Sequence, residues 1–201
     1  MKNTDTREVI MISIRLSTKN LQTDYYPFIL EPEARHLFLK ELASHFTART
    51  DLLDIQQHLD EILLTLDGQQ TESYTFALTL PRLISITLDT CNACGKNQQW
   101  FRSLSACIAM DAGLSRPIRL FISDPIPPII QWTGLHADRV STLTKEMAAG
   151  NSPSCLITHA LYKRLSPSIQ SKYATLYYIR HICCYCAELN KISTSKNTRK
   201  L

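Results

Sequence analysis

Glycine is scarce in this sequence: the 201 residues include five glycines, and no two of them are clustered. A loop that cradles phosphate groups depends on neighbouring glycines, so the sequence offers no such loop. The six histidines form neither an HxxxH nor an HExxH pair, and none has a serine or cysteine nearby in a known nucleophile arrangement. These absences predict a protein that is not an enzyme.

Long apolar runs and a strong charge imbalance are also lacking. No apolar run approaches the roughly 18 to 20 residues that span a bilayer, and the stretch from Val9 to Ile14 is too short for a signal peptide. The net charge is +4, and lysine and arginine are scattered until the tail, whereas a nucleic-acid-binding domain usually carries a basic face. We therefore expect a cytosolic protein that binds no nucleic acid.

The patterns that are present predict a mainly α fold: a single helical domain of about six to eight helices with a proline-rich central break. The helical domain is expected over residues 21–190. Residues 1–20 alternate weakly and predict an N-terminal arm or a short strand. Residues 191–201 hold four basic groups and no acid, which is typical of a disordered tail.

The first helices follow from apolar spacing. Phe38, Leu42 and Phe46 lie four residues apart after Pro32, which predicts a helix that begins at the proline. Residues 51–66 carry an apolar stripe and end before Gly68, where a C-cap glycine belongs, which predicts a second helix. The solvated face of this second helix would hold Asp51, Asp54, Asp60 and Glu61.

Further along, residues 69–79 read as a loop, and residues 80–88 favour a helix over a strand. Helical spacing also predicts helices over residues 100–110 and 132–147. Four prolines between Arg116 and Pro128 exclude a regular helix there, and residues 117–123 fit either a short strand or a core plug. Two Ser-Pro pairs, at 152–153 and 166–167, predict the starts of two later helices.

The seven cysteines are expected to be free thiols in a cytosolic protein, and neither a metal nor a cofactor is expected. Two CxxC pairs allow an alternative, because two such pairs can hold a tetrahedral zinc ion. The pairs consist of Cys91 with Cys94 and Cys183 with Cys186. The 88 residues between them exceed the spacing of a zinc ribbon. The alternative protein would be a zinc-stabilised adaptor or a nucleic-acid-binding protein.

A stiff aromatic segment precedes the first predicted helix, Asp24-Tyr-Tyr-Pro-Phe-Ile-Leu-Glu-Pro-Glu-Ala-Arg35. Rigid aromatic side chains lose little entropy when they dock on a partner, so this segment predicts a binding surface. An equally open interpretation is that it folds back over the helices as a lid. The candidate partner-binding residues are Asp24, Tyr25, Tyr26, Pro27, Phe28, Pro32 and Arg35.

This segment resembles the N-terminal signature of the SctK family, accessory proteins of the bacterial type III secretion sorting platform. Asp24, Leu30, Pro32 and Arg35 take the matching positions. The usual tyrosine is replaced by Phe28 or is displaced, and the histidine before the proline is replaced by Glu31. The stretch from 80 to 88 is similar to a mid-chain stretch of that family. The resemblance implies a non-catalytic cytosolic adaptor at the cytoplasmic face of the inner membrane. Its implied partners are an inner-membrane ring subunit and a pod protein, which would hold it at the membrane through protein contacts.

Overall fold

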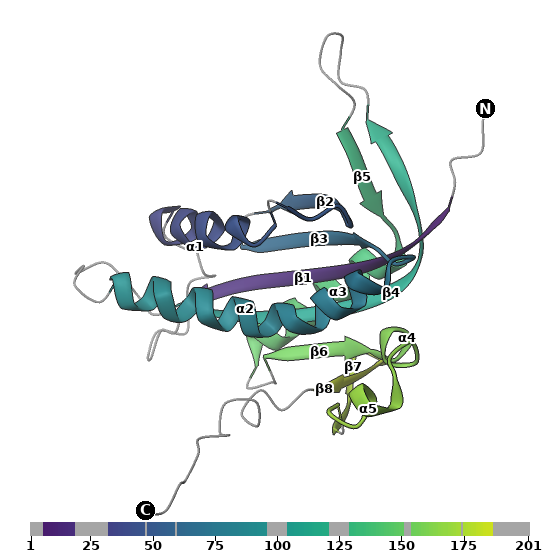
Figure 1. Ribbon diagram of the computed structural model, residues 1–201. Helices are drawn as coiled ribbons and strands as arrows, with labels where there is room; N and C mark the ends of the chain where they lie inside the picture. The colour runs from purple at the N-terminus through teal and green to yellow at the C-terminus, as the bar shows by residue number, and fades with distance from the viewer. Residues whose placement is uncertain are drawn as a thin grey trace, which may run out of the picture.

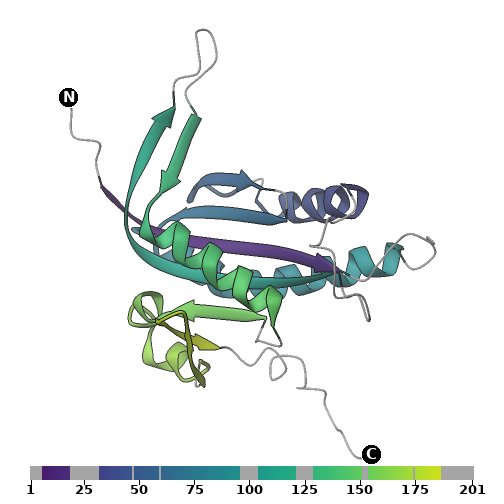
Figure 2. The same ribbon diagram turned by 180° about the vertical axis from the view of Figure 1, so that it is seen from behind.

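The chain folds around one mixed β-sheet with helices on both of its faces (Figures 1 and 2). The computed structural model describes residues 6–18, 32–46, 48–58, 60–95, 104–120, 129–150, 154–173 and 175–186. The helices are α1 (Pro32–Ser44), α2 (Thr71–Gly95), α3 (Leu135–Ala149), α4 (His159–Tyr162) and α5 (Pro167–Gln170). The strands are β1 (Arg7–Thr18), β2 (Leu52–Gln57), β3 (Glu61–Asp67), β4 (Leu104–Leu120), β5 (Ile129–Thr133), β6 (Cys155–Thr158), β7 (Thr175–Ile179) and β8 (Ile182–Cys186). The prediction of a mainly α fold is therefore wrong.

The sheet has the strand order β2-β3-β1-β4-β6-β8-β7, and β5 pairs with β4 off this path. Strand β1 lies between β3 and β4 and is antiparallel to both. The β4–β6 pair is parallel, and the remaining neighbours are antiparallel. The far half of β4 pairs with β5 as a hairpin that rises away from the other strands (Figure 1).

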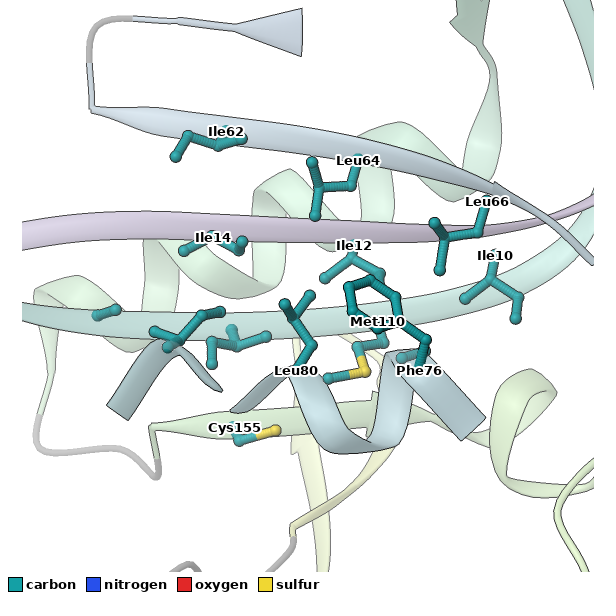
Figure 3. Close-up of a cluster of buried hydrophobic side chains, with 14 of the residues drawn as sticks. Ile10, Ile12, Ile14, Ile62, Leu64, Leu66, Phe76, Leu80, Met110 and Cys155 are labelled. Atoms are coloured by element: carbon teal, nitrogen blue, oxygen red, sulfur yellow. The ribbon is translucent and has the colours of Figure 1, made fainter. Parts of the chain in front are cut away.

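Two apolar cores cover the two faces of the sheet, because side chains alternate along each central strand. Ile10, Ile12 and Ile14 of β1 face α2, where they pack with β3 and α2 side chains (Figure 3). Val9 and Met11 face the opposite side and pack with α3. Helix α2 crosses one face of the sheet and α3 the other (Figures 1 and 2).

The predicted helix over residues 51–66 is wrong, and its residues form the β2–β3 hairpin instead. Every residue of β3 is buried, so the strand carries apolar side chains on both faces. A short apolar run of this kind fits helical spacing as well as alternation. The alternating set Ile62, Leu64 and Leu66 shares one core with α2 (Figure 3).

In the middle of the chain, one predicted element is confirmed and two are wrong. The expected loop over 69–79 lies largely within α2, whereas the helix favoured at 80–88 is confirmed by the same element. The helix predicted over 100–110 is wrong, because residues from Leu104 onward belong to β4. Within the described part of the chain, no helix is long and apolar enough to cross a membrane.

Of the other predicted helices, three are confirmed at least in part and one is not. The helix that begins at Pro32 is confirmed as α1, and most of the predicted 132–147 helix is confirmed as α3. The Ser-Pro pair at 152–153 lies outside the described residues, and the residues expected in its helix form strand β6 and the single turn α4 instead. Helix α5 does begin at Pro167 with Ser166 as N-cap. Beyond α5, the β7–β8 hairpin was not predicted from the sequence.

Candidate functional site

Helix α3 packs across one face of the sheet, and two polar clusters lie beneath it. The odd-numbered β1 residues face this helix, so Ser13 and Arg15 lie on the same side as Val9 and Met11. Strand β3 pairs Arg15 with Glu61 across the sheet. The polar side chains of β1 and β3 therefore meet directly under the middle of α3.

The first cluster is centred on the carboxylate of Glu61, and we call it the carboxylate network. Its members are Ser13, Arg15, Asp60, Glu61, Ser141 and Thr144. Ser13 and Ser141 each donate a hydrogen bond to Glu61 Oε1, at 2.5 and 2.6 Å. Arg15 Nη2 donates to Glu61 Oε2 at 3.0 Å, and its Nη1 donates to Asp60. Both oxygens of Glu61 are thus occupied by protein donors.

The carboxylate network does not fit a divalent cation. A magnesium ion is held by carboxylate oxygens that are free to coordinate it, whereas Asp60 and Glu61 each already form an ion pair with Arg15. The side chains of Arg15 and Glu61 are only 14% and 8% exposed, so the guanidinium is not easily displaced. Among the described residues, no group of three or more His, Cys, Asp or Glu side chains is placed to hold a metal ion.

The second cluster lies under the first turn of α3 and is centred on Asp111 of β4, which is fully buried. His136 Nδ1 lies 2.8 Å from Asp111 Oδ2, and Thr158 Oγ1 donates to Oδ1. The guanidinium of Arg139 lies farther away, at 3.7 Å. Burial alone would raise the pKa of Asp111, but the hydrogen bonds from His136 and Thr158 outweigh burial and hold that pKa below its usual range.

The His136 ring lies against the backbone of Gly113 on β4. A Cβ atom at position 113 would come within 2.2 Å of both Cε1 and Nε2 of His136, so no larger residue fits there without moving the ring. One ring nitrogen binds Asp111 and the other edge faces Gly113. We infer that His136 anchors the start of α3 on the sheet and is poorly placed to exchange protons with a ligand.

The sequence-based candidates are not brought together in either cluster. Asp24, Tyr25, Tyr26, Pro27 and Phe28 lie outside the described residues. Pro32 and Arg35 lie in the first turn of α1. The basic tail over 191–201 also lies outside the described part.

The zinc alternative fails because its four cysteines do not converge. Cys91 packs in the core on the α2 face, and Cys186 packs in the core on the α3 face. Cys94 is exposed at the end of α2, and Cys183 lies on β8. Burial raises the pKa of the Cys91 thiol to about 11, which disfavours the thiolate that zinc requires.

Sequence reasoning also missed the residues of the carboxylate network. We had placed Asp60 and Glu61 on the solvated face of a helix, and neither Ser13 nor Arg15 was a candidate. Asp51, from the same predicted face, is buried and accepts hydrogen bonds from Arg49 and Ser73. The available signal was the weak alternation of residues 9–15, which places Ser13 and Arg15 on one face of a strand.

The fold is that of nucleotide cyclase catalytic domains. No protein-family profile matches this sequence, and no curated protein sequence is significantly similar to it. The solved guanylyl cyclase Cya2 matches with a TM-score of 0.64 at 12% identity, over 90% of this chain and 92% of that chain. The adenylyl cyclase CyaB from P. aeruginosa matches with a TM-score of 0.60 at 13% identity, over 90% of this chain and 94% of that chain.

A third match is the guanylate cyclase domain of RhGC from Catenaria anguillulae, solved in complex with GTP. Its TM-score is 0.58 at 13% identity, and the match covers 91% of this chain and 98% of that chain. At such identities the likeness establishes the fold alone, over about nine-tenths or more of each chain.

This fold overturns the resemblance to the SctK family, which implied a helical protein. The prediction of a non-catalytic type III secretion adaptor is therefore wrong, and so is the alternative of a zinc-stabilised or nucleic-acid-binding protein. The expectation that the protein is not an enzyme is corrected as well, because its structural neighbours are catalytic domains. The cytosolic location and the ring and pod partners are untested by the fold and stay predictions.

Proposed function

We propose that this chain is a nucleotide-cyclase-type domain that takes a purine nucleoside triphosphate as its substrate. One observation carries the proposal: cyclase catalytic domains match this fold over about nine-tenths of the chain and of their own length. One of these structures holds GTP, and another match, a rhodopsin-guanylyl cyclase core, holds ATPalphaS. Both ligands are purine nucleoside triphosphates or analogues of them.

Closing a ring on a nucleoside triphosphate places two demands on a protein. A ribose hydroxyl must lose its proton, and the charge that grows on the departing phosphates must be neutralised. Metal ions often supply that neutralisation in phosphoryl transfer. Since Arg15 forms ion pairs with both carboxylates of the network, we assign the network no metal and no step of the reaction. Its contribution is to fix α3 on the sheet through the hydroxyls of Ser141 and Thr144.

The test has a binding arm and a product arm. Calorimetric titration of the purified chain with GTP and ATP, with magnesium or manganese present, should give saturable binding, and CTP serves as the control ligand. Mass spectrometry of the same mixtures should detect the cyclic monophosphate of the bound purine together with pyrophosphate. A folded chain that binds neither GTP nor ATP contradicts the proposal. Binding without a cyclic product contradicts the cyclase reaction.

A further inference from the structure

A pocket of about 440 Å³ opens beside the start of α3, where α4 and the turn between β7 and β8 come together. It shares no lining residue with the carboxylate network. We call it the basic pocket. Its lining residues are Arg139, Thr158, His159, Ala160, Lys163, His181, Ile182 and Cys183.

The lining of the basic pocket carries positive charge without a matching acid. Arg139 and Lys163 carry cationic side chains, the imidazoles of His159 and His181 can donate hydrogen bonds, and no lining residue is an aspartate or a glutamate. Within the described residues, Lys163 makes no side-chain hydrogen bond or ion pair. Arg139 makes one ion pair there, with Asp111, and at 3.7 Å it is longer than a hydrogen bond.

The carboxylate of Asp111 is already engaged and does not neutralise the pocket fully. It accepts hydrogen bonds from Thr158, from the Ala112 backbone and from His136. Most of the five N–H donors of the Arg139 guanidinium therefore remain for a ligand. His159 binds Tyr185 through Nδ1 at 3.0 Å, which leaves its Nε2 for another contact.

The two residues of the β7–β8 turn both have positive φ values. Arg180 and His181 have φ values of 45° and 66°, in the left-handed region where glycine and asparagine are most easily accommodated. Arg180 is tied to Glu146 of α3 by an ion pair of 2.6 Å. This contact places the turn beside α3, and His181 lies in the pocket wall. Unfavourable backbone of this kind often accompanies a functional role.

We infer that the basic pocket binds the phosphate groups of a small polyanion. Four basic side chains from α3, the α4 region and the β7–β8 turn line it, and phosphate oxygens accept hydrogen bonds from each of these residue types. The phosphates can be those of free pyrophosphate or those of a nucleotide. This inference does not depend on the proposed function, because pyrophosphate alone tests it.

Calorimetric titration of the full chain with pyrophosphate tests the pocket directly. Saturable binding is expected, and Lys163→Gln and His181→Asn should each weaken it by about tenfold, the loss of one charge-assisted hydrogen bond. Asparagine tolerates positive φ, so the second variant keeps the turn intact. Lys172→Gln is the matched control, because it removes the same charge from an exposed residue outside the pocket, and it should leave the affinity unchanged.

Competition separates the two sources of phosphate. Displacement of pyrophosphate by GTP or ATP, but not by guanosine or adenosine, assigns the pocket to the phosphates of a nucleotide. Pyrophosphate binding that nucleotides do not displace assigns it to the free anion, and either result supports the inference. Absence of saturable pyrophosphate binding by the folded chain overturns it, and so does an equal loss of affinity in Lys172→Gln. A chain that binds pyrophosphate but forms no cyclic product would contradict the cyclase proposal alone.

Discussion

Arg15 is the cationic side chain of the carboxylate network, and it forms ion pairs with both Asp60 and Glu61. Replacing it by methionine leaves Glu61, whose side chain is 8% exposed, without a cationic partner. We expect Arg15→Met to lower the free energy of unfolding by about 2–3 kcal/mol in urea titrations. The double variant Arg15→Met/Glu61→Gln should recover part of the loss, because it removes the unpaired charge. Equal stabilities of Arg15→Met and the native chain would contradict this account.

The same substitution tests why the network excludes a divalent cation. With Arg15 removed, the carboxylates of Asp60 and Glu61 become available as oxygen ligands. Manganese should then raise the melting temperature of Arg15→Met, since a ligand that binds only the folded state stabilises it. The double variant with Glu61→Gln should respond less. A similar manganese response in the native chain would show that Arg15 does not occupy the site.

Asp111 stabilises the fold only while it is ionised. Its pKa in the folded chain lies below the usual 3.8, so its contribution is complete above the unfolded pKa and is lost as the pH falls through the folded one. We expect Asp111→Asn to cost about 1–3 kcal/mol at neutral pH. The difference from the native chain should shrink below pH 3.8 in urea titrations repeated at decreasing pH. The exposed Asp89→Asn is the control, and a difference independent of pH would contradict the prediction.

Among helices and strands, the sequence predicts best the elements that have one solvated face. Helices α1 and α3 are partly exposed, and their apolar residues recur at helical spacing, as Phe38 and Leu42 of α1 do. Strands β3 and β6 are buried at every position, so no solvated face marks them as strands. In β3, Leu63 interrupts the alternation of polar and apolar residues, and the apolar run 62–64 therefore also fits helical spacing.

The β7–β8 hairpin has a tight turn that its sequence does not indicate. Its two turn residues, Arg180 and His181, have positive φ, where Asn-Gly is the strongest turn signal. Replacing the pair by Asn-Gly should raise the free energy of unfolding by about 1 kcal/mol, because it removes unfavourable backbone at two positions. The substitution should also weaken pyrophosphate binding. Reduced stability in urea titrations would show that the Arg180–Glu146 ion pair outweighs the backbone.

The candidate sites could not be predicted, because they exist only through long-range pairing. Glu61 meets Ser13 and Ser141, residues that lie 48 and 80 positions away in the chain. The strand register that joins them depends on recognising β1 and β3 as strands, and β3 had been assigned to a helix. The basic pocket likewise combines α3, α4 and a hairpin turn, and two of these three were misjudged. Because these elements were assigned wrongly, the residues that they bring together could not be recognised as candidate sites.

Both apolar cores pack on the same sheet, and this sharing determines how cooperatively the chain should unfold. Ile12 of β1 packs against α2, while Met11, the next residue, packs against α3. Neither core can be lost without exposing the same strand, so we expect one cooperative transition. Fluorescence of Trp132, which is buried in the α3 core, and far-ultraviolet circular dichroism should therefore give the same urea midpoint. Leu143→Ala in the α3 core and Ile84→Ala in the α2 core should each cost about 2–5 kcal/mol and move both signals together. If Leu143→Ala moved only the fluorescence transition, α3 would unfold independently of the sheet, and the two cores would not form one cooperative unit.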